Sequence, residues 1–259
     1  MSDFLLEVRD VTLDYNSTTG VIHALEDINF NIREGEFVCV LGPSGCGKST
    51  LLKLIAGFEQ TTDGEILLKG EKIQGIDSHR GVVFQRDNLF EWFSVRNNIN
   101  YGLRMQGRLS KDEIRKKTDD MIALMQLSEF SEKKVYELSG GMRQRVSIGR
   151  TLINDPEILL MDEPFSALDA LTREQLQDAL RSLWIEQKNT IFFITHDIDE
   201  AMVLGTRILL MSKRPGRIIR DMTIDYTYRI AKEGNSRRSL SEEYFQMRRE
   251  VFNLIAGID

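Results

Sequence analysis

The sequence predicts an α/β fold in which a parallel or mixed sheet core carries an antiparallel β region and an inserted α-helical subdomain. Three observations predict it. Strand and helix patterns alternate towards both ends of the chain, which is typical of parallel sheets. Phe37–Leu41 is apolar throughout, as expected of a strand buried on both faces. Residues 87–157 instead have mostly the pattern of amphipathic helices.

The N-terminal third is predicted to be mostly strands. Leu5–Arg9 and Ile28–Ile32 alternate between apolar and polar residues, as half-buried strands do. A turn at residues 34–36 then leads into the buried strand Phe37–Leu41. After a glycine-rich stretch, Thr50–Phe58 predicts a helix.

The middle third contains a clear helix start. Ser110 and Glu113 have the spacing of a capping box, and the apolar positions that follow predict an amphipathic helix to about Leu127. A second helix is expected from about Gly140 to about Asn154.

The C-terminal third returns to alternating strands and helices. Strands are predicted at Ile158–Met161 and Ile191–Ile194, with a helix over Thr172–Gln187 between them. Thr172 and Gln175 have the spacing of a second capping box.

Two late strands and a tail complete the prediction. Arg207–Ser212 and Gly216–Arg220 are expected to be strands on either side of a Pro215-Gly216 turn. The tail, residues 229–259, is expected to end in a helix. Its arginine pairs, at 237–238 and 248–249, are expected on a solvated face, because the charges of the tail nearly cancel.

Composition excludes several classes of protein. The 259 residues carry a formal net charge of −6, which argues against a non-specific nucleic-acid binder, whose affinity comes from neutralising phosphates. The longest apolar runs fall far short of the roughly 20 residues that span a bilayer. The N-terminus lacks the basic-then-apolar pattern of a signal peptide. Two cysteines, Cys39 and Cys46, are too few to stabilise a chain of this size through disulfide bonds, so a reduced, cytoplasmic location is expected.

A phosphate-binding motif follows the first buried strand. It matches the P-loop pattern G-x-x-x-x-G-K-[ST] and reads Gly42-Pro43-Ser44-Gly45-Cys46-Gly47-Lys48-Ser49. Its glycines let the backbone wrap an anion, and the helix N-terminus supplies positive potential. Lys48 is expected to reach the β- and γ-phosphates of a nucleotide, and Ser49 to bind Mg²⁺. Cys46 is expected to matter for its small size and its backbone, although a nucleophile is the alternative.

A pair of carboxylates follows another buried strand. Asp162 directly follows Ile158–Met161, and the carboxyl ends of parallel strands are where such sheets bind ligands. Asp162 is therefore expected to hold Mg²⁺, and Glu163 to orient or deprotonate an attacking water. Without the P-loop upstream, the pair would be assigned to a solvated strand end.

One segment indicates the family. Leu138-Ser139-Gly140-Gly141-Met142-Arg143-Gln144-Arg145 resembles the signature motif of the ATP-binding cassette (ABC) family. Other marks of that family follow in the expected order over nearly the whole chain: Tyr15 as the aromatic residue that stacks on adenine, Gln85 after Val82-Val83-Phe84, the D-loop Ser166-Ala167-Leu168-Asp169, and the switch histidine His196 in Thr195-His196-Asp197. Taken singly, Tyr15 and His196 would be ordinary structural residues, as His23 and His79 are expected to be.

The resemblance implies a P-loop NTPase with a RecA-like core. Its ABC ATPase domain would span residues 1–228, with the core at about 1–86 and 158–228, a helical subdomain at about 87–157, and the tail at 229–259. The implied catalytic residues are Lys48, Gln85, Glu163 and His196. The implied ATP-binding residues are Tyr15, Gly42, Pro43, Ser44, Gly45, Cys46, Gly47, Lys48, Ser49 and Thr50. The implied Mg²⁺ ligands are Ser49, Gln85 and Asp162.

The resemblance also implies that two copies act together. Ser139, Gly140 and Gly141 would offer helix N-terminal amides to the ATP of a partner copy, and Asp169 would lie at the same interface. Two chains would then sandwich two nucleotides head to tail with twofold symmetry. ATP hydrolysis would remove the γ-phosphate that both copies bind, which makes a two-state switch.

Partners and cargo follow only from the resemblance. The ATPase would sit peripherally on the cytoplasmic face of the inner membrane, bound to transmembrane permease subunits that work with a substrate-binding protein, and would not bind nucleic acid. Aromatic residues within 89–93 are expected either to form a groove for a permease helix or to fill the core of the helical subdomain.

Three stretches near the C-terminus indicate the subgroup. The stretches 214–218, 236–240 and 244–250 resemble the nitrate, sulfonate and taurine import group, most of all the taurine-import ATPases. Three alternatives remain: an ATPase of a different transporter, an exporter or envelope complex, and a soluble ABC ATPase that acts on ribosomes or DNA.

Overall fold

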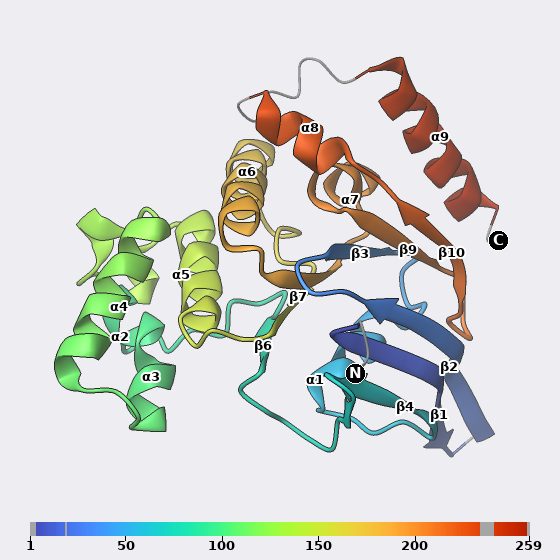
Figure 1. Ribbon diagram of the computed structural model, residues 1–259, viewed down its shortest axis with the longest axis horizontal. Helices are drawn as coiled ribbons and strands as arrows, with labels where there is room; N and C mark the ends of the chain where they lie inside the picture. The colour runs from blue at the N-terminus through green and yellow to red at the C-terminus, as the bar shows by residue number, and fades with distance from the viewer. Residues whose placement is uncertain (1–3, 19, 234–240, 258–259) are drawn as a thin grey trace. The chain divides into compact units, whose positions relative to one another are not determined.

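The computed structural model describes residues 4–18, 20–233 and 241–257, which form two compact units. Unit 1 contains the chain up to residue 77 and from residue 177 onwards, and unit 2 contains residues 78–176. Each unit combines strands with helices (Figure 1), which confirms the predicted α/β fold.

An antiparallel sheet forms the first part of unit 1. Its strands are β1 (Leu6–Ser17), β2 (Gly20–Ile32), β4 (Asp63–Leu68) and β5 (Glu71–Lys72), in the order β2-β1-β4-β5. β1 and β2 are much longer than the strands predicted at Leu5–Arg9 and Ile28–Ile32. Their register shifts between Val8 and Asp14, so the regular alternation that marks a strand in sequence is lost there.

Strands of a mixed, mostly parallel sheet form the second part of unit 1. β3 (Phe37–Leu41) pairs in parallel with β8 (Thr190–Ile194) and with β9 (Arg207–Met211), and β10 (Ile218–Thr223) pairs antiparallel to β9. Every residue of β3 and β8 is buried, as their uniformly apolar sequences predict.

The helices of unit 1 include α1 (Lys48–Ala56), α7 (Ile198–Leu204), α8 (Tyr226–Lys232) and α9 (Glu242–Ala256). α9 is the predicted tail helix. The predicted features at residues 236–240 lie outside the described residues.

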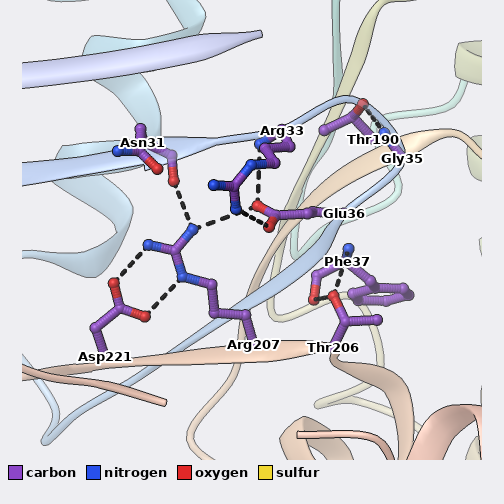
Figure 2. A network of polar contacts seen from close by, with 9 residues as sticks. All are labelled: Asn31, Arg33, Gly35, Glu36, Phe37, Thr190, Thr206, Arg207 and Asp221. Carbon is purple, nitrogen blue, oxygen red and sulfur yellow. Dashed lines mark hydrogen bonds and ion pairs between the residues drawn. The ribbon is translucent and has the colours of Figure 1, made fainter. Parts of the chain in front are cut away.

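A polar network centred on Arg207 joins the two sheets of unit 1 (Figure 2). Its guanidinium donates to Asp221 of β10 (Nε–Oδ1, 2.6 Å) and to the carbonyl of Asn31 in β2 (2.8 Å). Glu36 also accepts from Arg207, at 3.3 Å. Because only 13% of the Arg207 side chain is exposed, these contacts satisfy a charge that is largely removed from water.

Unit 2 consists of a strand pair and a group of helices. β6 (Arg80–Val83) runs parallel to β7 (Ile158–Asp162). The helices are α2 (Val95–Ile99), α3 (Tyr101–Gln106), α4 (Lys111–Leu124) and α5 (Gly140–Leu152), with single 3₁₀ turns at Ser128–Phe130 and Val135–Glu137 (Figure 1).

One predicted capping box is confirmed and the other is wrong. At the start of α4, the Ser110 N–H donates to Glu113 Oε2 (2.8 Å) and the Glu113 N–H donates to Ser110 Oγ (3.3 Å). The later helix, α6, instead begins at Ala170 and extends to Gln187, and Asp169 Oδ1 accepts from the Thr172 N–H at 3.0 Å. Thr172 therefore lies inside the first turn, because the chain offers Asp169 as an earlier cap.

The described arginines of the tail, Arg248 and Arg249, are both exposed, as predicted, but Arg248 also forms an ion pair. Arg248 of α9 donates to both carboxylate oxygens of Asp199 in α7, at 2.7 and 3.0 Å. Its guanidinium is thus committed to an ion pair, although 44% of the side chain is exposed. Arg249 is exposed, as predicted.

Candidate functional site

The P-loop connects β3 to α1 in unit 1, as the sequence predicts. Gly47 is the N-cap of α1, with φ +106°, and no side chain caps this helix start. A Cβ on Gly47 would come within 2.6 Å of the Leu25 side chain. Glycine is therefore required here by backbone conformation and by space, and the helix N-terminus keeps its amides for an anion.

Lys48 lies inside this loop. Its side chain is 5% exposed, and its ammonium donates to the carbonyls of Gly42 (2.8 Å) and Pro43 (3.0 Å). The loop thus folds around a positive charge, which suits a phosphate chain.

Cys46 is a buried structural residue of the loop. It is 1% exposed, and burial raises the pKa of its thiol. A raised pKa leaves less thiolate, so the geometry favours the predicted backbone role over a nucleophile.

Tyr15 lies close to other residues of the site in unit 1. Its hydroxyl donates to the carboxylate of Glu59, and it also contacts the Thr50 side chain. Burial, together with Glu59, raises the pKa of Tyr15. With 39% of the residue exposed, the ring is held by its hydroxyl but remains accessible for stacking.

His196 follows the strand next to the P-loop strand. β3 and β8 are parallel, with Val40 opposite Ile194, so the P-loop and the exposed His196 leave the same edge of the sheet. Thr195, just before His196, is buried and donates through Oγ1 to Glu200 (2.6 Å).

In unit 2, Gln85 and the carboxylate pair Asp162-Glu163 lie at the same edge of the β6–β7 strand pair. β6 and β7 are parallel, with Val83 opposite Met161, so Gln85 and Asp162 follow adjacent strand ends. Gln85 Nε2 donates to Ser166 Oγ at 3.2 Å, which joins Gln85 to the predicted D-loop.

Glu163 has an unusual backbone conformation. Its φ is +44°, in the left-handed region, and its carbonyl accepts from the Ser166 N–H (3.2 Å) and Oγ (3.0 Å). Residues other than glycine in this region cost free energy and occur at functional sites more often than elsewhere.

The predicted signature forms the start of α5. Ser139 is the N-cap, and its hydroxyl accepts from the Met142 N–H at 3.3 Å. A Cβ on Gly141 would collide with the methyl group of Thr172, whereas a Cβ on Gly140 would meet Leu168 at an ordinary 3.6 Å. The helix start therefore lies against the D-loop and the first turn of α6.

Asp169 caps α6 beside this helix start. The Thr172 N–H holds the pKa of the Asp169 carboxyl below its usual range. The side chain is therefore an anion and a fixed hydrogen-bond acceptor at neutral pH.

Two arginines of α5, neither of them predicted as functional, hold the segment after Gln85. Arg143 Nε donates to Asp87 Oδ2 (2.9 Å), and Arg150 donates to the carbonyls of Asn88 (3.0 Å) and Asp87 (3.1 Å). Burial lowers the pKa of Arg150. Their sequence signal is weak, because arginines on a helix are usually solvated.

Arg214 is indicated by the sequence only as part of a subgroup pattern. Its Nη2 donates to the P-loop carbonyl of Gly45 at 3.4 Å, and its charge acts on Tyr15 to lower the phenol pKa. It therefore adds a cation between two predicted ATP-binding elements of unit 1.

The aromatic segment contains both half-buried rings and an exposed ring, and its contact with a permease stays a prediction. Phe90 packs on Tyr101 with ring centroids 4.7 Å apart, and Phe93 packs on Tyr101 at 5.9 Å, so these half-buried rings form one cluster in unit 2. Trp92, in contrast, is 68% exposed.

The donor set is chemically suited to Mg²⁺. The predicted ligands offer a hydroxyl, a carboxylate and an amide oxygen, and Mg²⁺ prefers oxygen. Gln85 uses its amide nitrogen for Ser166, so its oxygen end can serve a metal. Among the described residues, no group of three or more His, Cys, Asp and Glu side chains could hold a metal ion.

Comparison with known proteins gives a consistent result. A family model described as ABC transporter matches residues 25–166. A taurine import ATP-binding protein, TauB, of Rhizobium johnstonii is 47% identical over 249 residues, covering 95% of each chain. An aliphatic sulfonates import ATP-binding protein, SsuB, of Bacillus cereus is 41% identical and covers 93% of this chain and 94% of its own.

Solved structures give the same fold. The dimeric post-hydrolysis state of the ATP-binding cassette MJ0796, bound to ADP and Pi, aligns with a TM-score of 0.75 and 34% identity. The alignment covers 85% of this chain and 99% of the cassette. In the part of the chain that the structure describes, no helix is both long and apolar enough to cross a bilayer.

Proposed function

Because the chain belongs to the ABC transporter family, we propose that it is the ATP-hydrolysing subunit of a bacterial importer for taurine or a related alkanesulfonate. The observation that carries this proposal is the extent of the similarity to import ATP-binding proteins. With 95% of both chains aligned to the taurine-import relative, the match spans both units and both glycine-rich helix starts. The comparison with a cassette bound to ADP and Pi supports ATP as the nucleotide.

In unit 1 we assign nucleotide binding to the P-loop, Thr50 and Tyr15. Lys48 and the amides at the start of α1 bind the phosphates, and the Tyr15 ring stacks on adenine while Glu59 fixes its hydroxyl. His196 contacts the γ-phosphate, which its position beside the P-loop strand supports.

In unit 2 we assign the hydrolytic water to Glu163. Its carboxylate accepts a proton as the water attacks the γ-phosphate, and the position of Glu163 directly after the carboxyl end of β7 supports this role. Gln85 orients the same water. A movement of Gln85 between nucleotide states is transmitted to the following segment, which Arg143 and Arg150 hold.

Ser49, Gln85 and Asp162 would hold Mg²⁺. The cation supplies neutralisation of the charge that develops on the phosphate oxygens.

We propose a homodimer as the working unit. One copy offers Ser139, Gly140, Gly141 and Asp169 to the ATP bound by the other, so each ATP is bound between copies. The dimeric cassette among the similar solved structures supports this arrangement.

The remaining partners are permease subunits and a substrate-binding protein, with the ATPase peripheral on the cytoplasmic face of the membrane. The exposed Trp92 supports a permease contact in unit 2. We further propose that residues 1–228 act as the ATPase domain, with core regions 1–86 and 158–228, a permease-facing helical subdomain at 87–157, and a tail at 229–259.

A growth experiment tests the function. A strain lacking this chain should lose growth on taurine or other alkanesulfonates as sole sulfur source and retain growth on nitrate as sole nitrogen source. The wild-type chain should restore growth and the Glu163→Gln variant should not. Unimpaired growth on every sulfonate would contradict the assigned cargo, and co-purification with ribosomes or DNA instead of a multi-span permease would contradict transport.

A further inference from the structure

His196 is attached to a short helix whose position depends on its neighbours. α7 begins two residues after His196, and Asp197 caps it by accepting from the N–H groups of Asp199 (2.8 Å) and Glu200 (3.3 Å). A helix of seven residues is too short to be stable alone, so contacts from outside must fix its place.

Buried groups fix the inner side and the far end of α7. Glu200, 5% exposed, accepts from Gln177 Nε2 (3.0 Å) and from Thr195 Oγ1 (2.6 Å). At the far end, the carbonyl of Val203 accepts from Thr227 of α8 (2.8 Å) and from Arg181 of α6 (3.2 Å).

The end of α7 nearest to His196 is held from outside by α9. The Tyr244 hydroxyl donates to Asp199 Oδ1 (2.9 Å), and Arg248 donates to Asp199 Oδ1 and Oδ2 (2.7 and 3.0 Å). The Tyr244 ring is 2% exposed and packs edge-on against Tyr226 of α8, with ring centroids 5.1 Å apart. One face of α9 is thus anchored, and it presents two donors to a single carboxylate three residues after His196.

We propose that Tyr244 and Arg248 are positioning residues for His196. Together they fix Asp199, whose backbone N–H is bonded to Asp197, the residue directly after His196. Loss of the Asp199 contact would loosen the segment 196–199 and misplace the imidazole relative to the γ-phosphate. The inference rests on the proposed function, because it requires His196 to act on ATP.

The Asp199–Arg248 ion pair is expected to affect the position of His196 more than the stability of the fold. The Asp199–Arg248 pair is partly exposed on both sides, at 48% and 44%, and exposed ion pairs contribute little to the stability of a fold. The buried contacts of Glu200 and Val203 do not involve this pair. The pair is therefore more important for where His196 lies than for whether the protein folds.

Steady-state ATP hydrolysis by the full chain tests the proposal. Tyr244→Phe keeps the buried ring and removes only the hydroxyl, and Arg248→Ala removes the charge. Each variant should lower kcat about threefold to fivefold with unchanged KM and melting temperature, the size expected when a partly exposed contact sets a geometry. Arg248→Lys should recover part of the loss. Arg249→Ala, one position along α9 and exposed, is the matched control and should keep wild-type kcat.

Two further single variants, each also combined with Arg248→Ala, separate failure of the positioning role from failure of the proposed function. His196→Ala should abolish most turnover, and adding Arg248→Ala to it should lower kcat no further. Asp199→Ala should lower kcat as much as Asp199→Ala combined with Arg248→Ala. If Tyr244→Phe and Arg248→Ala match Arg249→Ala while His196→Ala is inactive, the positioning role is overturned and the proposed function stands. If His196→Ala itself retains wild-type turnover, the assigned role of His196 is wrong and the inference is overturned with it.

Discussion

At the residue scale, Glu163 directly follows β7 and has a left-handed backbone conformation. Its φ of +44° lies in a region where a residue with a Cβ costs free energy relative to glycine. The sequence indicates Glu163 through its position after an apolar strand, but no sequence pattern indicates its conformation.

We expect Glu163→Gln to bind ATP and to lose hydrolysis. Glutamine keeps the size and hydrogen bonding of the side chain but cannot accept a proton from water, so the γ-phosphate remains and the dimer accumulates. Size-exclusion chromatography with ATP measures the dimer, and phosphate release measures turnover. Near-wild-type phosphate release would show that Glu163 is not the base.

We expect Lys48→Ala to lose nucleotide affinity. The ammonium forms charge-assisted hydrogen bonds, and losing them should weaken ATP binding about tenfold to a hundredfold. A calorimetric titration measures this, with Lys116→Ala, an exposed lysine of α4, as control. Equal affinities of the two variants would contradict the assignment.

At the scale of elements, predictability follows burial. The strands β3, β7 and β8 are predicted nearly to the residue, because a short run that is apolar throughout is typical of a strand buried on both faces. β1 and β2 are longer than predicted, because their register shifts break the alternation that identifies a strand. The predicted start of α6 is wrong because Asp169 and Thr172 are both good caps, and only the fold selects between them.

The start of α5 gives a prediction at this scale. Gly141→Ala should lower the free energy of unfolding by about 1–3 kcal/mol, because its new methyl group must displace Thr172. Gly140→Ala, with ordinary contact distances at its Cβ, should be close to neutral in stability. Chemical denaturation of both variants measures the difference. A Gly141→Ala protein as stable as Gly140→Ala would contradict the packing of α5 on α6.

For the whole molecule, the family is identifiable from ordered motifs, and the contacts between distant segments are not. Arg248 illustrates this: its partner Asp199 lies 49 residues earlier, and nothing in either local sequence indicates the pair. The Arg207 network is equally invisible, since its partners come from three separate strands and turns.

Whole-molecule stability should depend on pH through Cys39. Burial, with a contribution from Glu200, raises the pKa of its thiol well above the ordinary value. Above the unfolded thiol pKa of about 8.5, the unfolded chain therefore binds fewer protons than the folded one, and stability falls as pH rises. Below that pH the thiol is protonated in both the folded and the unfolded chain, so it causes no loss of stability.

Denaturant unfolding from about pH 7 to about pH 10 checks this. The unfolding free energy should fall more steeply for the wild type than for Cys39→Ala above about pH 8.5. Parallel curves for the two proteins would rule out the thiol as a cause.

The ends of the two sheets in unit 1 have a consequence for aggregation. β5, at one end of the antiparallel sheet, has only two residues, Glu71 and Lys72, and β10, which pairs with β9, carries the exposed charges of Arg220 and Asp221. Short, charged edge strands are poor templates for strands of other molecules. The Arg207 network holds Asp221 on that edge, so a contact that joins two sheets also helps to keep crowded copies from adding strand to strand.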